Sequence, residues 1–195
     1  MIPQVFTNDG QFVRKFGSKG TGLGQLKGPC GLALDSNGRV IVAERDNHRI
    51  HIFDSEGQAV MHFGVYGDGE GKFNCPRHIA VDQNDDIFVS DAGNFRVQKF
   101  NSEGEFLAKF GEKGSNSGQL SCPAGIAVDS EGHIAVADLK NLNVQILDSD
   151  GVFIKKLGDT ETKNGGVFGK PTGLAISRHG NIVVADRGHH KIQVF

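Results

Sequence analysis

The chain has 195 residues, of which 37% are hydrophobic and 23% are charged, and its net charge at pH 7 is −2. This composition excludes a disordered chain, and the lack of any apolar run near about 18 residues excludes a membrane-spanning helix. The three cysteines form no Cys-x-x-Cys pair, and the N-terminal residues lack a signal-peptide pattern. We therefore expect a cytoplasmic protein with no membrane partner.

One sequence pattern occurs four times along the chain. Asp-x-x-Gly-x-Ile/Val-x-Val-Ala/Ser-Asp/Glu stands at residues 35–44 and 129–138, with Asp85 in place of the glycine at 82–91 and Ser177 in place of the first aspartate in the variant at 177–186. The prolines that open the four copies, Pro29, Pro76, Pro123 and Pro171, lie 47, 47 and 48 residues apart. A fixed period of this size indicates a stack of one supersecondary unit, so we expect any binding surface to come from the stack as a whole.

Each copy of the repeat predicts four short strands. In the first copy these are 30–34, 39–43, 49–53 and 58–63, separated by turns such as Asp35-Ser36-Asn37-Gly38. Glycine or Asx-Gly interrupts every apolar run within about ten residues, which is too short for a typical helix. Four antiparallel strands joined by hairpin turns make one blade of a β-propeller. We refer to the strands of a blade as a, b, c and d.

In chain order, the repeats divide a single domain, residues 1–195, into blades. Residues 1–17 hold a strand d with part of a strand c, the segments 28–64, 75–111 and 122–158 hold complete blades, and 170–195 holds strands a to c. In a closed ring, the first strand d would complete the last blade and hide both sheet edges. Four blades make a tight ring, so the sequence is compatible with both a closed ring and an open arc. An open arc would leave room for self-association.

The motifs resemble the NHL repeat, which is named after an Asn-His-Leu-like triplet between strands b and c. The triplets here are Asn47-His48-Arg49, Asn94-Phe95-Arg96, Asn141-Leu142-Asn143 and His189-His190-Lys191. The resemblance covers practically the whole chain and implies an all-β, NHL-type β-propeller with about four blades of four antiparallel strands. The NHL family includes RNA binders, protein-binding modules and a lyase.

The segments 16–26 and 110–120, which connect a strand d to the next strand a, look most like those in the C-terminal domains of animal tripartite-motif NHL proteins. Many of those carry an N-terminal RING ubiquitin ligase module and repress mRNAs, and their propellers have six blades. The resemblance therefore implies that this chain is a fragment or departs from the family architecture.

Charge separates by loop type. In a propeller, the b–c and d–a loops share one end, here called the basic rim, and the a–b and c–d turns share the other, here called the acidic rim. The acidic rim is rich in Asp and Glu, with only Arg39 and Arg178 as bases. The d–a loops on the basic rim carry Lys19, Lys27, Lys72, Lys113, Lys163 and Lys170. This asymmetry would allow a polyanion to bind one rim, although acidic residues also simply favour turns.

Two sets of residues on the basic rim have different expected roles. Glu44, Asp91, Asp138 and Asp186 recur at one repeat position, which predicts a structural hydrogen-bonding role. The candidate RNA or partner contacts differ between copies, or follow a repeat proline, and provide cations, imidazoles or an aromatic ring for phosphates and bases. They are Arg45, His48, Arg49, Arg77, His78, Phe95, Arg96, Lys140, Arg187, His189, His190 and Lys191. Alternatively, Phe95 packs on its neighbour, and Arg49, Arg96 and Lys191 cover the flank of strand c.

A lyase on this fold would need a metal held by histidines from several blades. The triplet centres are His48, Phe95, Leu142 and His190, so two of these positions cannot ligate a metal. We therefore expect no catalytic residues, metal, cofactor or small-molecule substrate. The leading hypothesis is a scaffold that binds RNA, such as mRNA, on the basic rim. The alternative is a protein–protein recognition module, such as the substrate- or partner-binding part of a ubiquitin ligase.

Overall fold

The computed structural model describes residues 2–158 and 167–195. Three sheets have four antiparallel strands in the order a, b, c, d, and a fourth sheet has three. Blade 1 contains β5 (Pro29–Leu34), β6 (Val40–Glu44), β7 (Arg49–Phe53) and β8 (Ala59–Phe63). Blade 2 contains β9 (Pro76–Val81), β10 (Ile87–Asp91), β11 (Arg96–Phe100) and β12 (Phe106–Phe110). Blade 3 contains β15 (Pro123–Val128), β16 (Ile134–Asp138), β17 (Asn143–Leu147) and β18 (Phe153–Leu157), and blade 4 contains β19 (Pro171–Ile176), β20 (Ile182–Asp186) and β21 (Lys191–Val194).

The repeated Asp-x-x-Gly motif builds the turn between strands a and b. Asp35 Oδ1 accepts hydrogen bonds from the main-chain N–H groups of Asn37 at 3.0 Å and Arg39 at 2.8 Å. Asp82 and Asp129 bond their own turns in the same way. Gly38 has a φ of 74°, a left-handed conformation that glycine adopts without steric cost. The aspartate and a left-handed residue at the fourth position therefore fix the hairpin in blades 1 to 3, and in blade 2 that residue is Asp85, with a φ of 62°, instead of a glycine.

The hydrophobic core lies between blades. Each blade has a leading face, toward the preceding blade, and a trailing face, toward the next one. Ile41 and Ile50 on the trailing face of blade 1 pack with Ile79 and Val89 on the leading face of blade 2. Blades 2 and 3, and blades 3 and 4, repeat this packing. Because the central strands bury side chains on both faces, all five residues of β7, β10, β16 and β17 are buried.

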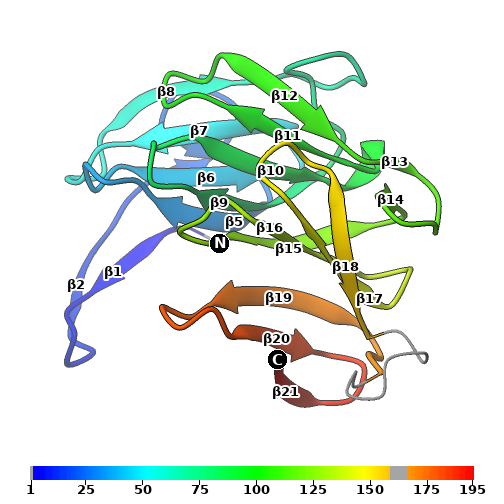
Figure 1. Ribbon diagram of the computed structural model, residues 1–195. Helices are drawn as coiled ribbons and strands as arrows, with labels where there is room; N and C mark the ends of the chain where they lie inside the picture. The colour runs from blue at the N-terminus through cyan, green and yellow to red at the C-terminus, as the bar shows by residue number, and fades with distance from the viewer. Residues whose placement is uncertain (1, 159–166) are drawn as a thin grey trace.

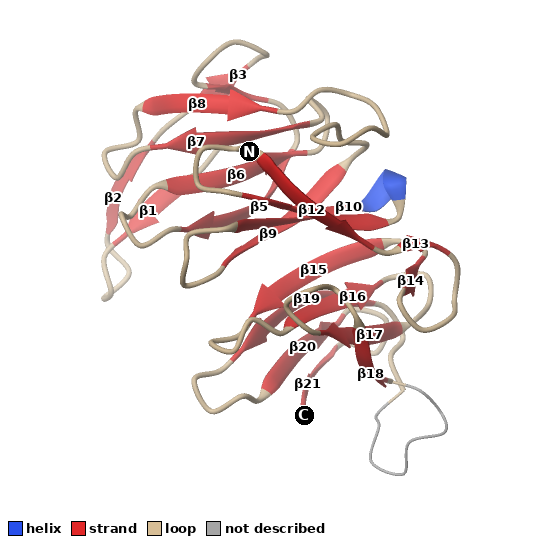
Figure 2. Cartoon of the chain, turned by 45° about the horizontal axis from the view of Figure 1, so that its top comes forward, coloured by secondary structure: helices blue, strands red, loops and turns tan. Residues whose placement is uncertain are grey.

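The four blades fan out as an open arc, which confirms the predicted fold class (Figure 1). The inner strands β5, β9, β15 and β19 contact one another in turn. At one end of the arc, β1 (Gln4–Phe6) and β2 (Phe12–Lys15) form a hairpin of their own beside blade 1, and blade 4 forms the other end (Figures 1 and 2). Among the described residues, β2 does not pair with β21, so the first strand d does not close a ring with the last blade.

The first three loops from strand d to the next strand a are held by main-chain hydrogen bonds, such as those from the Gly20 N–H to the Leu26 carbonyl and from the Gly67 N–H to the Phe73 carbonyl. Two of them contain short parallel pairs, β3 (Ser18–Lys19) with β4 (Gln25–Leu26) and β13 (Glu112–Lys113) with β14 (Gln119–Leu120). Each d–a loop inserts one apolar residue between blades, and these residues, Leu26, Phe73, Leu120 and Phe168, are buried. The only helix in the described part of the chain is the short η1 (Ala92–Asn94), and no helix there is long and apolar enough to cross a membrane.

Candidate functional site

A buried carboxylate ends strand b in every blade. Glu44, Asp91, Asp138 and Asp186 are at most 1% exposed. Each accepts a hydrogen bond from a main-chain N–H of the preceding d–a loop, donated by Lys27, Asn74, Ser121 and Gly169 respectively. The predicted structural role of these four carboxylates is confirmed. They join the d–a loop to the b–c loop and so assemble the basic rim.

The first residue of the triplet belongs to the same network. Asn47 Nδ2 donates to Glu44 Oε2 at 2.5 Å and to the Gly20 carbonyl at 3.0 Å. Asn94 and Asn141 make the equivalent pair of bonds in blades 2 and 3. In blade 4, His189 Nδ1 lies 2.8 Å from Asp186 Oδ2. The side chain at this position therefore holds the rim together, and in blade 4 it is half-exposed at 43%.

The third residue of the triplet requires a correction for two predicted contacts. Arg49 and Arg96 are only 5% and 6% exposed, and each donates from Nε to the carboxylate of its own blade. The two Nη atoms of Arg49 bond the carbonyls of Thr21, Gly22 and Gln25. Those of Arg96 bond the carbonyls of Asp68, Gly69 and Lys72. Both guanidinium groups are thus committed to the protein, which goes beyond the expected covering of the strand c flank, and we remove them from the candidate binding surface.

The pKa values of the carboxylates in blades 1 and 2 are shifted in opposite directions. Burial disfavours the charged form of Glu44, but hydrogen bonds from His51 and Arg49 outweigh it and hold the pKa of Glu44 below its usual range. Burial dominates at Asp91 and raises its pKa, despite hydrogen bonds from Asn74, Asn94 and Arg96. In blade 4, burial of Asp186 is outweighed by the main-chain N–H groups of Lys170 and Gly169, so its pKa is lowered.

The central residue of every triplet has a left-handed backbone. His48, Phe95, Leu142 and His190 have φ values of 52°, 59°, 54° and 53°. A non-glycine residue in this region is uncommon, and its recurrence in all four blades marks a position that the surrounding bonds fix. None of the four side chains is fully buried. Each triplet thus has a central residue whose side chain is at least partly exposed on the basic rim.

Two of these central side chains meet the following d–a loop. The His48 ring lies edge-on to Tyr66, with 4.9 Å between centroids, and its Nδ1 accepts a hydrogen bond from the Cys75 N–H at 3.1 Å. The Lys113 ammonium lies 5.1 Å from the centroid of Phe95. Phe95 thus packs on its neighbour, as one interpretation expected, and remains half-exposed. Sequence reasoning missed Tyr66, although it is the one tyrosine of the chain and lies in a rim loop.

Most other predicted contacts lie at the surface. Arg45 is exposed and pairs with Asp46 at 2.8 Å. Lys140 is exposed on the b–c loop of blade 3. In blade 4, Arg187, His190 and Lys191 surround a hollow of ≈ 390 Å³ whose floor includes Ile192. The d–a lysines Lys19, Lys27, Lys72, Lys113 and Lys170 are exposed, and Lys163 lies outside the described residues.

Arg77 and His78 stand apart from the triplet loops. Both are half-buried on the inner strand β9. The His78 N–H donates to Ser90 Oγ at 2.9 Å, and burial, with a smaller effect of Arg77, lowers the pKa of His78. The Nε of Arg77 is buried and has no hydrogen-bond partner among the described residues. These two residues therefore face the inner side of the arc rather than the triplet loops.

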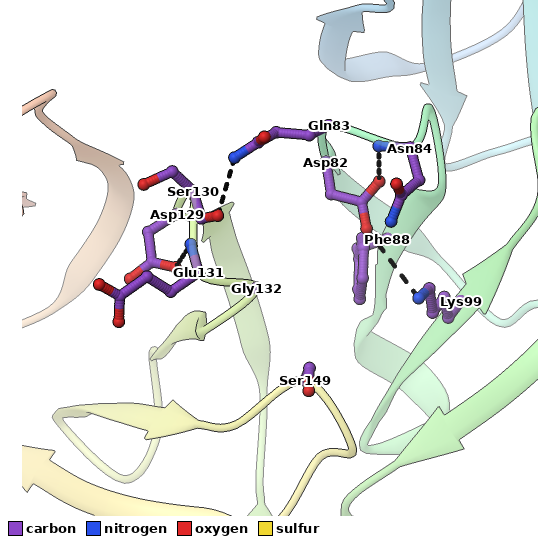
Figure 3. Close-up of a pocket in the computed structure, with 10 residues that line it drawn as sticks. All are labelled: Asp82, Gln83, Asn84, Phe88, Lys99, Asp129, Ser130, Glu131, Gly132 and Ser149. Carbon is purple, nitrogen blue, oxygen red and sulfur yellow. Dashed lines mark hydrogen bonds and ion pairs between the residues drawn. The ribbon is translucent and has the colours of Figure 1, made fainter.

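The acidic rim holds concave sites that the sequence did not indicate. A cavity of ≈ 320 Å³ lies between the a–b turns of blades 2 and 3 (Figure 3). Gln83 Nε2 spans these turns and donates to the Ser130 carbonyl at 2.7 Å, while Lys99 Nζ lies 3.9 Å from Asp82 Oδ2 (Figure 3). Within the described residues, no group of three or more His, Cys, Asp or Glu is placed to hold a metal ion. The charged groups of this cavity are already engaged within the protein, since Lys99 Nζ lies 2.8 Å from Asp86 Oδ2 and His133 Nδ1 lies 2.9 Å from Asp129 Oδ2.

Comparison with solved structures supports the fold. A catalytically inactive virginiamycin B lyase from Staphylococcus aureus, crystallised with Quinupristin, has a TM-score of 0.72 at 14% identity and matches 99% of this chain and 59% of its own. A chain in the Nidogen/Laminin complex has a TM-score of 0.67 at 20% identity, over 91% of this chain and 64% of that one. At these identities the likeness shows the fold alone, and this chain spans less than two thirds of either.

Sequence comparison identifies the repeat. A segment of 40 residues is 48% identical to part of Protein lin-41 from Caenorhabditis elegans, covering 20% of this chain and 4% of that protein. The NHL repeat matches residues 26–53, 73–100, 120–147 and 168–195. These four segments make up more than half of the chain, which therefore belongs to the NHL-repeat family.

Proposed function

We propose that this propeller arc is a non-catalytic scaffold that binds single-stranded RNA on its basic rim, in post-transcriptional regulation of the tripartite-motif NHL type. The observation that carries the proposal is the pairing of aromatic and cationic side chains on neighbouring rim loops. His48 meets Tyr66, and Phe95 meets Lys113. Aromatic faces and cations on one surface suit unpaired bases and the phosphates between them.

The exposed cations supply the electrostatic part of the interaction. Arg45, Lys140 and Arg187 are exposed on the b–c loops of three different blades, so a strand that follows the rim would meet one after another. Glu44, Asp91, Asp138 and Asp186 lie beneath this surface and are already engaged by main-chain N–H groups. Their negative charge is therefore partly compensated within the protein, which lowers the repulsion of a polyanion.

The test is RNA binding at about 50 and about 200 mM salt, with a slope of log K against log salt of about −0.7 for each phosphate contacted. Fluorescence anisotropy with labelled single-stranded and hairpin RNA measures this slope. Arg187→Glu on the basic rim should weaken binding and reduce the slope. Arg178→Glu is the matched control, because Arg178 is equally an exposed arginine of blade 4 but lies on the acidic rim. Equal effects of the two variants, or a slope near zero, would contradict the proposal.

A protein partner is the second candidate. Leu142, the triplet centre of blade 3, is an apolar side chain that is 40% exposed on the same rim. Such a residue suits an apolar anchor in a protein interface better than it suits phosphate. A ubiquitin-ligase substrate or partner would be one such ligand. Leu142→Asp separates the two candidates. It should abolish capture of a protein partner, whereas RNA binding should weaken only at low salt, where the added negative charge is poorly screened.

A further inference from the structure

The third residue of the triplet changes in blade 3. This residue lies opposite the carboxylate that ends strand b, in the pairs Glu44↔Arg49, Asp91↔Arg96 and Asp138↔Asn143. The b–c loops and d–a loops of these three blades have equal lengths, so their residues correspond one to one. Part of the d–a loop of blade 4 lies outside the described residues. Blade 3, with an asparagine, is therefore compared with blades 1 and 2, which have an arginine.

In blades 1 and 2 the guanidinium fills a place made of oxygen atoms. Arg96 donates from Nε to the carboxylate of its blade at 3.0 Å, and from its Nη atoms to the carbonyls of Asp68 and Gly69 at 2.7 Å and of Lys72 at 2.8 Å. Arg49 makes the same set of bonds in blade 1. The planar fork of N–H donors on a guanidinium matches such a set of acceptors, whereas an ammonium is a compact point charge.

Blade 3 keeps these acceptors but has no guanidinium among them. The corresponding loop carbonyls belong to Ser115, Asn116 and Gln119. Among the described residues, no side chain donates to the first two, and Gln145 Nε2 donates to the third. The equivalent glutamine of blade 2 makes that same bond while Arg96 is in place, so the bond leaves room for a guanidinium.

Asn143 adds an acceptor without a partner. It is only 5% exposed, and its Nδ2 donates to the Asn141 carbonyl at 3.2 Å, which fixes the orientation of the amide. Its Oδ1 is buried and accepts no hydrogen bond from the described residues. Asn143 begins at the same strand position as Arg96, so its amide stands where an arginine side chain begins its course in blade 2. A buried oxygen without a donor is unfavourable, which favours a ligand that donates to it.

The buried carboxylate of blade 3 also lacks a cation. Asp138 is 0% exposed and accepts hydrogen bonds from main-chain N–H groups, such as that of Ser121, and from Asn141 Nδ2. The described residues give it no ion partner, whereas Asp91 has Arg96 at 3.0 Å. Neutral donors stabilise a carboxylate but leave its charge in place, so a cation is favoured here over a neutral ligand.

We propose that this place in blade 3 binds the guanidinium group of an arginine side chain that a partner protein presents. The guanidinium donates to the Asp138 carboxylate, to Asn143 Oδ1 and to the carbonyls of the d–a loop, as the chain's own arginines do in blades 1 and 2. The side chains of Arg49 and Arg96 keep 7% and 8% of their surface exposed, so the equivalent place is covered without being sealed from solvent.

The neighbouring side chain fits a protein partner. Leu142 directly precedes Asn143 and is 40% exposed, so an arginine bound here would bring its own chain beside an apolar contact. Arginine is enriched among the residues that dominate protein interfaces. RNA has no cationic group for this place. The inference therefore rests on the second candidate function, the protein partner, and not on RNA binding.

Two probes of equal charge test the proposal on the intact chain. N-acetyl-arginine methylamide, titrated at constant ionic strength into isotope-labelled protein, should cause saturable shifts in the NMR signals of the amides of residues 115–119 and of the Asn143 side chain. Millimolar concentrations are needed, because a ligand of so few atoms binds weakly. N-acetyl-lysine methylamide should not saturate over the same range, because an ammonium lacks the fork. No saturable shift with the arginine probe, or equal saturation with the lysine probe, would overturn the proposal.

Filling the place from within provides a second test. Asn143→Arg restores the residue of blades 1 and 2, so it should raise the urea midpoint and abolish saturable binding of the arginine probe. Asn84→Arg is the matched control, because it adds the same charge at an exposed asparagine of the acidic rim and should leave the binding unchanged. Binding that survives Asn143→Arg, or that is lost equally in both variants, would exclude this site. Neither test contains RNA, so failure here is distinguishable from failure of RNA binding, and loss of partner capture is measured separately with Leu142→Asp.

Discussion

The Nε of Arg96 lies 3.0 Å from Oδ2 of Asp91, and the two side chains are 8% and 0% exposed. Arg49 and Glu44 make the same pair in blade 1 at 2.7 Å. Each arginine also bonds carbonyl groups of the preceding d–a loop, so one guanidinium ties three segments of chain together. In the sequence Arg49 and Arg96 resemble surface cations, but in the structure they are buried beneath the rim and connect its loops.

Removing either buried arginine should strongly destabilise the fold. Arg49→Ala and Arg96→Ala each leave a buried carboxylate without its ion partner, which costs about 3–5 kcal/mol when one member of a buried pair is lost. Arg45→Ala removes an arginine whose partner Asp46 is partly exposed, and should cost about 0–1 kcal/mol. Urea unfolding followed by circular dichroism measures all three. Similar midpoints for Arg45→Ala and Arg96→Ala would contradict the structural role.

The two carboxylates should respond to pH in opposite directions. The folded pKa of Glu44 is lowered, so its ionisation contributes stability that is complete above the unfolded pKa of about 4.3 and is lost as pH falls through the folded pKa. The folded pKa of Asp91 is raised, so its contribution is present below the unfolded pKa of about 3.9 and is lost as pH rises through the folded pKa.

Isosteric amides isolate these contributions. The free-energy difference between the wild type and Glu44→Gln should shrink as pH falls from neutral toward acid, whereas titration of Asp91 should make the difference for Asp91→Asn grow in that direction. Urea unfolding between about pH 3 and 7 covers both ordinary carboxyl pKa values. The prediction is wrong if both differences change with the same sign.

Tyr66 should contribute to RNA binding through its ring. Loss of one base–aromatic stack costs about 1–3 kcal/mol, so Tyr66→Ala should weaken the binding of single-stranded RNA by roughly 5- to 150-fold. Tyr66→Phe keeps the ring beside His48 and should bind as the wild type does. Because neither change alters the charge, the salt slope should stay constant in both variants. Anisotropy titrations check the affinities, and an unchanged affinity for Tyr66→Ala would remove this ring from the binding surface.

Two glycines at one repeat position provide a test of the open arc. A Cβ on Gly125 would lie 2.5 Å from the Thr172 carbonyl oxygen of the next blade, whereas a Cβ on Gly173 meets nothing within 4 Å among the described residues. Gly125→Ala should therefore destabilise the fold by about 1–3 kcal/mol through overpacking. Gly173→Ala should stay within about 0.5 kcal/mol. Urea unfolding measures both variants, and equal losses would contradict the open face beside β19.

The fold could be predicted because the information is repeated. The a–b turns and the alternating strands recur in every copy, so a local departure such as Asp85 or Ser177 does not obscure the pattern. The recurrence of Glu44 and its equivalents also revealed their structural role. The roles of Arg49 and Arg96 could not be predicted, because their partners are main-chain carbonyls of a loop with no sequence signature. Ring closure was equally hidden, since strand phase does not determine the rotation between blades.

The left-handed backbone at the triplet centre has a consequence for how such chains diversify. Hydrogen bonds on either side fix the conformation, while the side chain itself takes little part in the core, so histidine, phenylalanine and leucine all occupy the site. The triplet centre of each blade is thus one position with a fixed backbone and a variable side chain. Exchanging the residue at one of these centres would change the surface of a single blade and leave the hydrogen bonds on either side of it in place.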